Sequence, residues 1–405
     1  MARRILTTGK AFKRTDGRWG GAVWYMDDFE ERKRKCFSGK TKAEVKRKMV
    51  EYINTFKREV EEKQAAHMRL DESMKTWLTI FKYPSIERTT YDRYECTAEH
   101  QIYPTLGKKA VGSITAADVK KLLNKMMEDG YAYTTSKKVY MLLNEYFHYL
   151  TQEEMIQKNP LDNVDMIKRQ NYLAMQGKEN IADRDKITIF TEEEIEKFKR
   201  EAFKTWGEEN TAKHQQSAAY LLMLNTGLRA GEMLGVLNSD IDLENKTMAI
   251  QRSVKEVYSR EGTTFTSGRE IMVGKTKSLT SNRVVPLNSV ALEMIAKLRA
   301  ERYKGEDSPL VCDEKGGFTR PVNFRKRFYR ILEQAGIEQK GLHSLRHTFA
   351  TKLVNGVKQE DGTIKSLSPR EVADLLGHST SDITEHYYVK RDNERLVGIT
   401  DGFEF

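Results

Sequence analysis

The sequence has few cysteines, no long apolar run, and no internal repeat or low-complexity tract. Its three cysteines, Cys36, Cys96 and Cys312, are widely separated along the 405 residues. They form neither a disulfide framework nor a Cys-x-x-Cys metal motif, which favours a reducing compartment. No apolar stretch is long enough to cross a bilayer, and the first residues lack a hydrophobic signal core. We therefore expect a soluble, cytoplasmic protein that does not associate with membranes.

Positive charge is what the sequence has in excess. It holds 69 lysines and arginines against 59 aspartates and glutamates, a formal net charge of +10. This balance suits a polyanionic partner, because basic side chains neutralise phosphates and release their counterions. A merely soluble basic protein would show the same balance. Hydrophobic residues make up 39% of the chain, which is enough for true cores, and a chain of this length usually forms about two or three domains.

Residues 1–62 are strongly basic and predict a small β-sheet followed by a helix. Two strand patterns, 18–26 and 32–38, are separated by an acidic turn. Thr41 and Glu44 then have the spacing of a capping box before a helix with apolar residues at helical intervals. A sheet packed on one helix, with lysines and arginines outside, would fit a DNA groove. The alternative is a solvated basic arm.

Residues 70–164 have helical periodicity throughout and predict a compact helical domain. Asn159-Pro160 stops the pattern, because the residue before a proline disfavours the helical conformation. Residues 165–188 are polar, with mixed charge and few apolar anchors, and predict an interdomain linker.

Residues 189–405 predict a mixed α/β domain with a C-terminal tail, so the expected fold class is multidomain, mainly α with small β-sheets. Thr191 and the three glutamates after it have the pattern of a helix start. Residues beyond 289 are again mostly helical in pattern, and the charged insertion at 355–367 predicts an exposed loop without a chemical role. Three short strand patterns lie between these helical parts: 247–253, 271–275 and 283–286.

Arg229 follows Thr226-Gly227, where a helix end and a tight turn can present a side chain at a pocket floor. The guanidinium group is a planar fork of donors that fits phosphate oxygens. A structural arginine paired with Glu232 or Asp240 is the alternative at this position.

Arg346 shares a helix face with His343, three residues before it. His347 completes an i,i+4 histidine pair, which raises the question of a metal. A helical zinc pair would normally carry a glutamate between its histidines, and here the fixed cation Arg346 opposes a second one. We therefore expect no metal at this pair.

A second histidine motif, Gly377-His378, is followed by two adjacent tyrosines, Tyr387 and Tyr388. The glycine can end a helix and turn the imidazole inward, although a lone histidine of this kind is commonly a core residue. Adjacent helical side chains diverge by roughly 100°, so only one tyrosine can face a shared pocket. A tyrosine hydroxyl can attack phosphorus, and with the two arginines this suggests a metal-free phosphodiester transferase. Lys277 lies at the tip of an expected hairpin, with 283–286 as its return strand; it is either solvated or a proton donor in a DNA groove.

Arginine, lysine, His-x-x-Arg, Gly-His and tyrosine, in this order, resemble the signature of the tyrosine recombinase (phage integrase) family. The signature covers roughly residues 190–391 and is specific as a set. The N-terminal parts look like the arm-binding and core-binding domains of lambda-type and conjugative-transposon integrases. The resemblance implies an arm-binding module at 1–62, a core-binding domain at 70–164 and a tyrosine recombinase catalytic domain at 189–405.

The resemblance implies phosphate-binding roles for four residues. Arg229 and Arg346 would clamp the non-bridging oxygens of the scissile phosphate. His343 would add a hydrogen bond or take part in proton transfer, and His378 would hold another phosphate oxygen.

The resemblance also implies a general acid and a nucleophile. Lys277 would protonate the leaving 5′ oxygen, with Lys275 as a substitute because the expected hairpin is long. Tyr388 would attack to give a 3′-phosphotyrosyl intermediate. We favour it over Tyr387 because a cation, Lys390, lies two residues after it, where relatives carry a histidine.

The resemblance finally implies an integrase of a phage or conjugative transposon that integrates and excises the element. It would bind double-stranded DNA at core and arm sites as a homotetramer and pass through a Holliday junction, without metal, ATP or another cofactor. Excisionase and DNA-bending accessory proteins are further candidate partners. The alternatives are a chromosome-dimer resolvase, against which the basic N-terminal module argues, a type IB topoisomerase, and a catalytically decayed DNA-binding protein.

Overall fold

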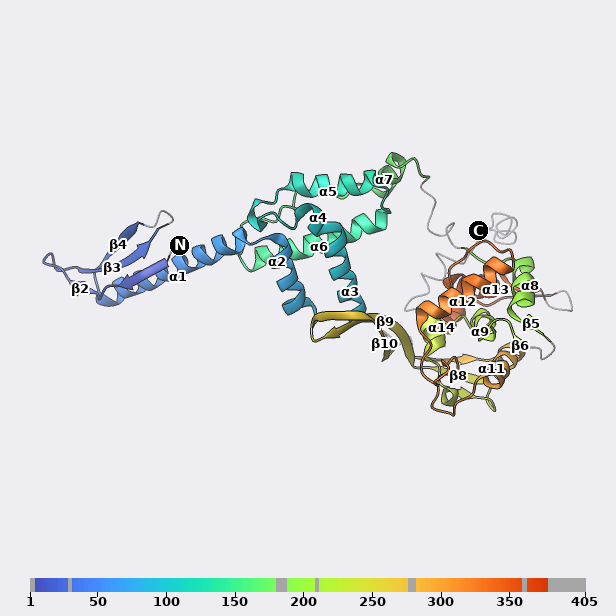
Figure 1. Cartoon of the computed structure of the whole chain (residues 1–405). Helices are drawn as coiled ribbons and strands as arrows, with labels where there is room; N and C mark the ends of the chain where they lie inside the picture. The colour runs from blue at the N-terminus through green and yellow to red at the C-terminus, as the bar shows by residue number, and fades with distance from the viewer. Residues whose placement is uncertain are drawn as a thin grey trace, which may run out of the picture. The chain divides into compact units, whose positions relative to one another are not determined.

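The computed structural model describes residues 4–27, 31–179, 188–207, 211–275, 282–358 and 363–377. The chain divides into two compact units, Met1–Asn180 and Ile181–Phe405 (Figure 1). The fold class expected from the sequence, multidomain and mainly helical with small β-sheets, is confirmed. None of the helices in the described ranges is long and apolar enough to span a membrane.

The first unit begins with an antiparallel sheet on which one long helix packs (Figure 1). Val23 of the sheet and Val45 and Met49 of the helix form a small buried core. Thr41 caps the helix as expected, since its Oγ1 accepts from the backbone N–H of Glu44 at 3.1 Å. Two of the strands escape the sequence patterns, β1 and β2. The elements are β1 (Arg4–Thr8), β2 (Phe12–Lys13), β3 (Trp19–Met26), β4 (Arg32–Gly39) and α1 (Lys42–His67).

The helical part of the first unit packs around a single apolar core that includes Met74, Trp77 and Tyr146. Thr115 and Asp118 form a capping box at the start of α5. Two segments continue their helices in the wider π form, a geometry that usually occurs as single turns. The elements are α2 (Leu70–Trp77), η1 (Leu78–Lys82), α3 (Arg88–Thr97), η2 (Ala98–Ile102), α4 (Tyr103–Leu106), η3 (Val111–Ser113), α5 (Ala116–Glu128) and α6 (Tyr133–Gln152).

The segment expected to be a linker, 165–188, begins with a docked helix, α7 (Arg169–Met175). Tyr172 is its anchor: the side chain is buried, and its hydroxyl lies 2.8 Å from Oγ of Ser136 and donates to the carbonyl of Tyr131 at 2.9 Å. The first part of the predicted linker thus contains a helix that one buried tyrosine with two polar partners holds on the preceding domain.

The second unit holds a mixed α/β fold around one large core, to which α8, α9, α11 and α12 contribute buried residues. Thr191 caps α8 as expected, and Glu194 completes a capping box with it. The helices are α8 (Glu192–Ala202), α9 (Ala218–Thr226), α10 (Ala230–Gly235), η5 (Asn238–Asp240), α11 (Ser289–Glu301), α12 (Pro321–Gln334), α13 (His343–Asn355) and α14 (Pro369–Leu376). The strands are β5 (Thr205–Trp206), β6 (Thr211–Ala212), β7 (Ile241–Asp242), β8 (Thr247–Ile250), β9 (Arg252–Glu261), β10 (Thr264–Lys275), β11 (Arg283–Pro286), β12 (Val357–Lys358) and β13 (Ile364–Lys365).

The strands on either side of Lys277 do not form the hairpin that the sequence predicts. β10 pairs with β9 in a long antiparallel hairpin, whereas β11 pairs with β8 in a separate sheet of β11, β8 and β7. β11 is therefore not the return strand of a hairpin that begins with β10. The chain crosses from one sheet to another there, and Lys277 itself lies outside the described residues.

The charged insertion at 355–367 contains a short ladder between β12 and β13. Its return is fixed by a hydrogen bond from the N–H of Leu367 to the carbonyl of Leu353 at 2.8 Å. The expected loop is thus shorter than the whole insertion.

Candidate active site

The turn that presents Arg229 depends on Gly227. The buried helix α9 ends at Thr226, and Gly227 follows with φ of 66°, the left-handed conformation that glycine adopts without strain. A Cβ at this position would lie 2.6 Å from Cδ1 of Phe349 and 2.7 Å from Cδ2 of Leu376. The close approach of these two side chains therefore requires glycine. Arg229 then occupies the N-cap position of α10, with 38% of its side chain exposed.

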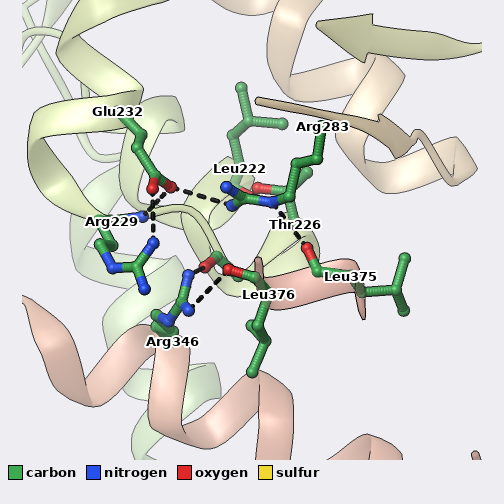
Figure 2. A network of polar contacts seen from close by, with 9 residues as sticks. Leu222, Thr226, Arg229, Glu232, Arg283, Arg346, Leu375 and Leu376 are labelled. Atoms are coloured by element: carbon green, nitrogen blue, oxygen red, sulfur yellow. Dashed lines mark hydrogen bonds and ion pairs between the residues drawn. The ribbon is translucent and has the colours of Figure 1, made fainter. Parts of the chain in front are cut away.

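Glu232 joins two arginines beneath this turn (Figure 2). Nη1 of Arg229 donates to its Oε1 at 2.7 Å, and Nη2 of Arg283 donates to its Oε2 at 2.9 Å. Burial tends to raise the pKa of Glu232, but the hydrogen bonds and charges of Arg283 and Arg229 outweigh it and lower the pKa below its usual value. The pairing of Arg229 with Glu232 that the sequence offered as an alternative is real, whereas Asp240 pairs with Arg252.

Arg346 lies on α13 and is only 1% exposed. Its Nη1 donates to the carbonyl of Gly227 and its Nη2 to the carbonyl of Leu376, both at 2.8 Å (Figure 2). These carbonyls end α9 and α14, where the negative end of each helix dipole favours a cation. Arg346 thus ties two helix ends together, with two of the five N–H groups of its guanidinium.

His343 and His347 begin α13 and meet edge to face, with ring centroids 4.4 Å apart. Desolvation, then the charges of His347, Arg346 and Arg229, lower the pKa of His343 to about 4. Desolvation and Arg346 also lower the pKa of His347 to about 4. His343 is exposed to water, which limits how far its pKa falls. Since both pKa values lie below their usual value of 6.5, both rings are neutral at pH 7.

The structure brings Arg229 and Arg346 together, because Arg346 donates to the carbonyl of Gly227, two residues before Arg229 (Figure 2). His343 lies one helical turn before Arg346 on α13. The helix end expected before His378 is present: Gly377, with φ of 66°, ends α14. Four of the residues that the sequence singled out lie outside the described residues: Lys277, His378, Tyr387 and Tyr388. The backbone of Lys275, the alternative to Lys277, pairs with Arg252 at the last position of β10.

Sequence reasoning missed Arg283 as a member of this cluster. It appeared only as the first residue of a strand pattern. Arg283 and Val285 are two residues apart on β11 and so lie on one face of the strand, and Val285 is buried. An arginine on the buried face of a strand needs a carboxylate or carbonyl partner, and this was the available signal. Among the described residues, no group of three histidine, cysteine, aspartate or glutamate side chains could hold a metal ion.

Two sequence families match this chain. The phage integrase family matches residues 188–394, and the phage integrase central domain matches residues 70–166. A tyrosine recombinase XerC-like protein of Caldanaerobacter subterraneus subsp. tengcongensis is 30% identical over 369 residues, which are 88% of this chain and 87% of the relative. The transposase of transposon Tn916 from Enterococcus faecalis is 27% identical over 304 residues, 70% of this chain and 65% of that protein.

The fold is similar to that of a solved integrase. A lambda integrase tetramer bound to a Holliday junction superposes with a TM-score of 0.56 at 16% identity, covering 94% of this chain and 95% of the integrase chain. The family match over half of the chain, and the XerC-like relative matched over most of its length, lead to one conclusion. The chain belongs to the phage integrase family and is a tyrosine recombinase.

Proposed function

We propose that this recombinase is the integrase of a mobile element and that it cuts and rejoins DNA through a covalent link to Tyr388. The observation that carries the proposal is the closeness of the two arginines: Arg346 donates to the carbonyl of Gly227, two residues before Arg229 (Figure 2), and His343 lies one helical turn before Arg346 on α13. Two guanidinium groups beside one neutral imidazole are suited to a phosphodiester, whose non-bridging oxygens accept charge-assisted hydrogen bonds. The relatedness to a transposon transposase favours a mobile element over a chromosome-dimer resolvase.

In this proposal Arg229 receives the scissile phosphate, because its guanidinium is the more exposed of the two. Arg346, fixed by two carbonyls, adds a second positive charge that cannot move away. Both charges stabilise the phosphorane as negative charge grows on its oxygens, and loss of one such donor typically costs ~3 kcal/mol. The neutral ring of His343 can donate from one nitrogen and accept at the other, and His378 would hold a further oxygen.

The chemical step conserves the energy of the phosphodiester. The hydroxyl oxygen of Tyr388 forms a bond to phosphorus as its proton passes to the neutral ring of His343, the bond from phosphorus to the 5′ oxygen breaks, and Lys277 gives that oxygen a proton. Rejoining reverses these changes, with the 5′ hydroxyl of another strand as the nucleophile. Since one phosphodiester replaces another, the reaction needs no ATP. The charges of Arg229 and Arg346 would supply the stabilisation that a metal ion gives in other phosphoryl transfers.

The proposed assembly is a homotetramer on double-stranded DNA. Lambda integrase, which shares the fold, was solved as a tetramer on a Holliday junction. The helical part of the first unit would hold the core site and the basic sheet module the arm site, with excisionase and DNA-bending proteins as accessory partners.

Covalent capture tests the chemistry. Wild type, Tyr388→Phe and Tyr387→Phe would be incubated with nicked duplexes that carry the joined ends of the element encoding this chain. Wild type and Tyr387→Phe should form a protein–DNA adduct whose peptide maps to Tyr388, and Tyr388→Phe should form none. An adduct that maps to Tyr387 would move the nucleophile by one residue. If neither wild type nor Tyr387→Phe forms an adduct although both bind the DNA, the protein is a DNA-binding protein without strand-cleaving activity.

A further inference from the structure

We infer that Arg283 is a positioning residue that couples Arg229 to the last turn of α14, immediately before His378 in the sequence. The inference rests on the proposed function, because this coupling affects catalysis only if Arg229 binds the scissile phosphate. Three observations support it: the two directions in which Arg283 donates, the charge balance around Glu232, and the arrangement of the end of α14.

Arg283 spans the distance between two parts of the site with one guanidinium (Figure 2). Its Nη2 donates to Oε2 of Glu232 at 2.9 Å, and its Nε donates to the carbonyl of Leu375 at 2.8 Å. The side chain is only 6% exposed, so water does not replace either partner easily. A planar fork with donors at fixed angles suits this double contact, whereas the single ammonium of lysine does not.

The charge balance explains why Arg229 needs this neighbour. Glu232 is buried and accepts from both the backbone N–H and the guanidinium of Arg229. With Arg229 alone it would form a neutral pair and cancel much of the attraction for a phosphate. With Arg283 added, two cations face one carboxylate and the cluster keeps a net charge of +1. Arg283 therefore leaves Arg229 oriented by Glu232 and still attractive to an anion.

The second contact of Arg283 fixes the end of α14. Arg283 and Arg346 donate to adjacent carbonyls, those of Leu375 and Leu376. The chain then turns at Gly377 in the left-handed conformation. Two guanidinium groups thus hold the last turn before His378 at consecutive residues, which limits how the helix end can rotate. Through Arg283, a displacement of this helix end is transmitted to Glu232 and from there to Arg229.

Arg283→Gln and Arg283→Lys, with Arg299→Gln as the matched control, test the inference. Arg299 also donates to one side-chain oxygen and one carbonyl, both of Asn238, at 3.0 Å each, and neither of these contacts involves a residue of the site. Three quantities would be measured for the full chain: the single-turnover cleavage rate on nicked DNA, the affinity for that DNA, and the thermal unfolding midpoint. Arg283→Gln should cleave about 10–100-fold more slowly than wild type, the loss that is typical when a residue that orients a metal ligand is removed.

The outcome separates positioning from general stability. We expect the DNA affinity of Arg283→Gln to stay within about threefold of wild type, its unfolding midpoint to match that of Arg299→Gln, and Arg283→Lys to recover part of the cleavage rate. Cleavage by Arg283→Gln within twofold of wild type overturns the inference, as does an equal loss in Arg299→Gln. It is also overturned if both Arg283 variants unfold while Arg299→Gln stays folded, because Arg283 is then purely structural. Failure of wild type to form any adduct refutes the proposed function instead.

Discussion

His343 and His347 lie edge to face at the start of α13, with an interplanar angle of 86° and 4.4 Å between ring centroids. Neither ring accepts a proton readily, because each is partly desolvated and close to Arg346. The pair therefore makes the stability of the second unit depend on pH.

Acidification from pH 6.5 to 4 should destabilise the folded chain. The pKa of each histidine falls from an ordinary value of 6.5 to about 4 on folding. In this window the unfolded chain binds more protons than the folded chain, so the free energy of unfolding rises with pH. The contribution is complete above pH 6.5 and is lost as the pH falls toward 4. Urea unfolding at several pH values would measure the slope.

A variant with both histidines replaced, His343→Gln with His347→Gln, is the control for this slope. Its free energy of unfolding should depend less on pH between 4 and 6.5 than that of wild type. Glu201 also contributes to acid unfolding, but at lower pH than the histidines. Hydrogen bonds from Lys204, Lys213 and His214 outweigh its burial and lower its pKa to about 2. An unchanged slope in the double variant would show that these histidines do not titrate as inferred.

Gly227→Ala should impair both stability and cleavage. The substitution places a methyl group against Phe349 and Leu376 and strains a backbone with positive φ, which together cost about 2–4 kcal/mol. It also shifts the carbonyl that accepts from Arg346. Chemical denaturation would measure the first effect and covalent adduct formation the second.

Gly336→Ala is the matched control for that substitution. Gly336 follows α12 with φ of 68°, but a Cβ there would meet nothing within 4 Å. We expect it to cost about 1 kcal/mol from backbone strain alone and to leave the cleavage rate unchanged. Equal losses in the two variants would mean that the packing around Gly227 contributes nothing.

The parts of the fold that the sequence predicts correctly are those with local causes. The helix starts at Thr41 and Thr191 each depend on a threonine hydroxyl that accepts from the backbone N–H three residues later. The turns at Gly227 and Gly377 each need one residue that tolerates positive φ. The His-x-x-Arg spacing of α13 likewise predicts a shared helix face. These features are visible in a single sequence because the interacting groups are close along the chain.

What the sequence does not reveal depends on partners far along the chain. The pairing of β11 with β8 rather than β10 is set by tertiary packing, and no turn motif in the sequence predicts it. Tyr172 docks α7 on residues more than thirty positions earlier. Arg283 meets Glu232 and Leu375, which only the folded chain brings together. The two arginines of the predicted site, and Glu232 as a candidate partner of Arg229, could be named from the sequence, but Arg283, which joins them, could not.

The proposed general acid can be identified with a substrate that does not need one. A DNA strand with sulfur in place of the bridging 5′ oxygen leaves as a thiolate, and a thiol has a pKa of about 8.5, against about 15.7 for water. Lys277→Ala should cleave the ordinary substrate about 10²–10⁴-fold more slowly than wild type and the sulfur substrate at nearly the wild-type rate. Lys275→Ala is the matched control and should cleave both normally. Arg346→Gln should remain slow on both, because the growing charge on phosphorus-bound oxygens still needs stabilisation. If the sulfur substrate instead restores cleavage by Lys275→Ala, Lys275 is the proton donor. If it restores cleavage by neither lysine variant, neither lysine is the general acid.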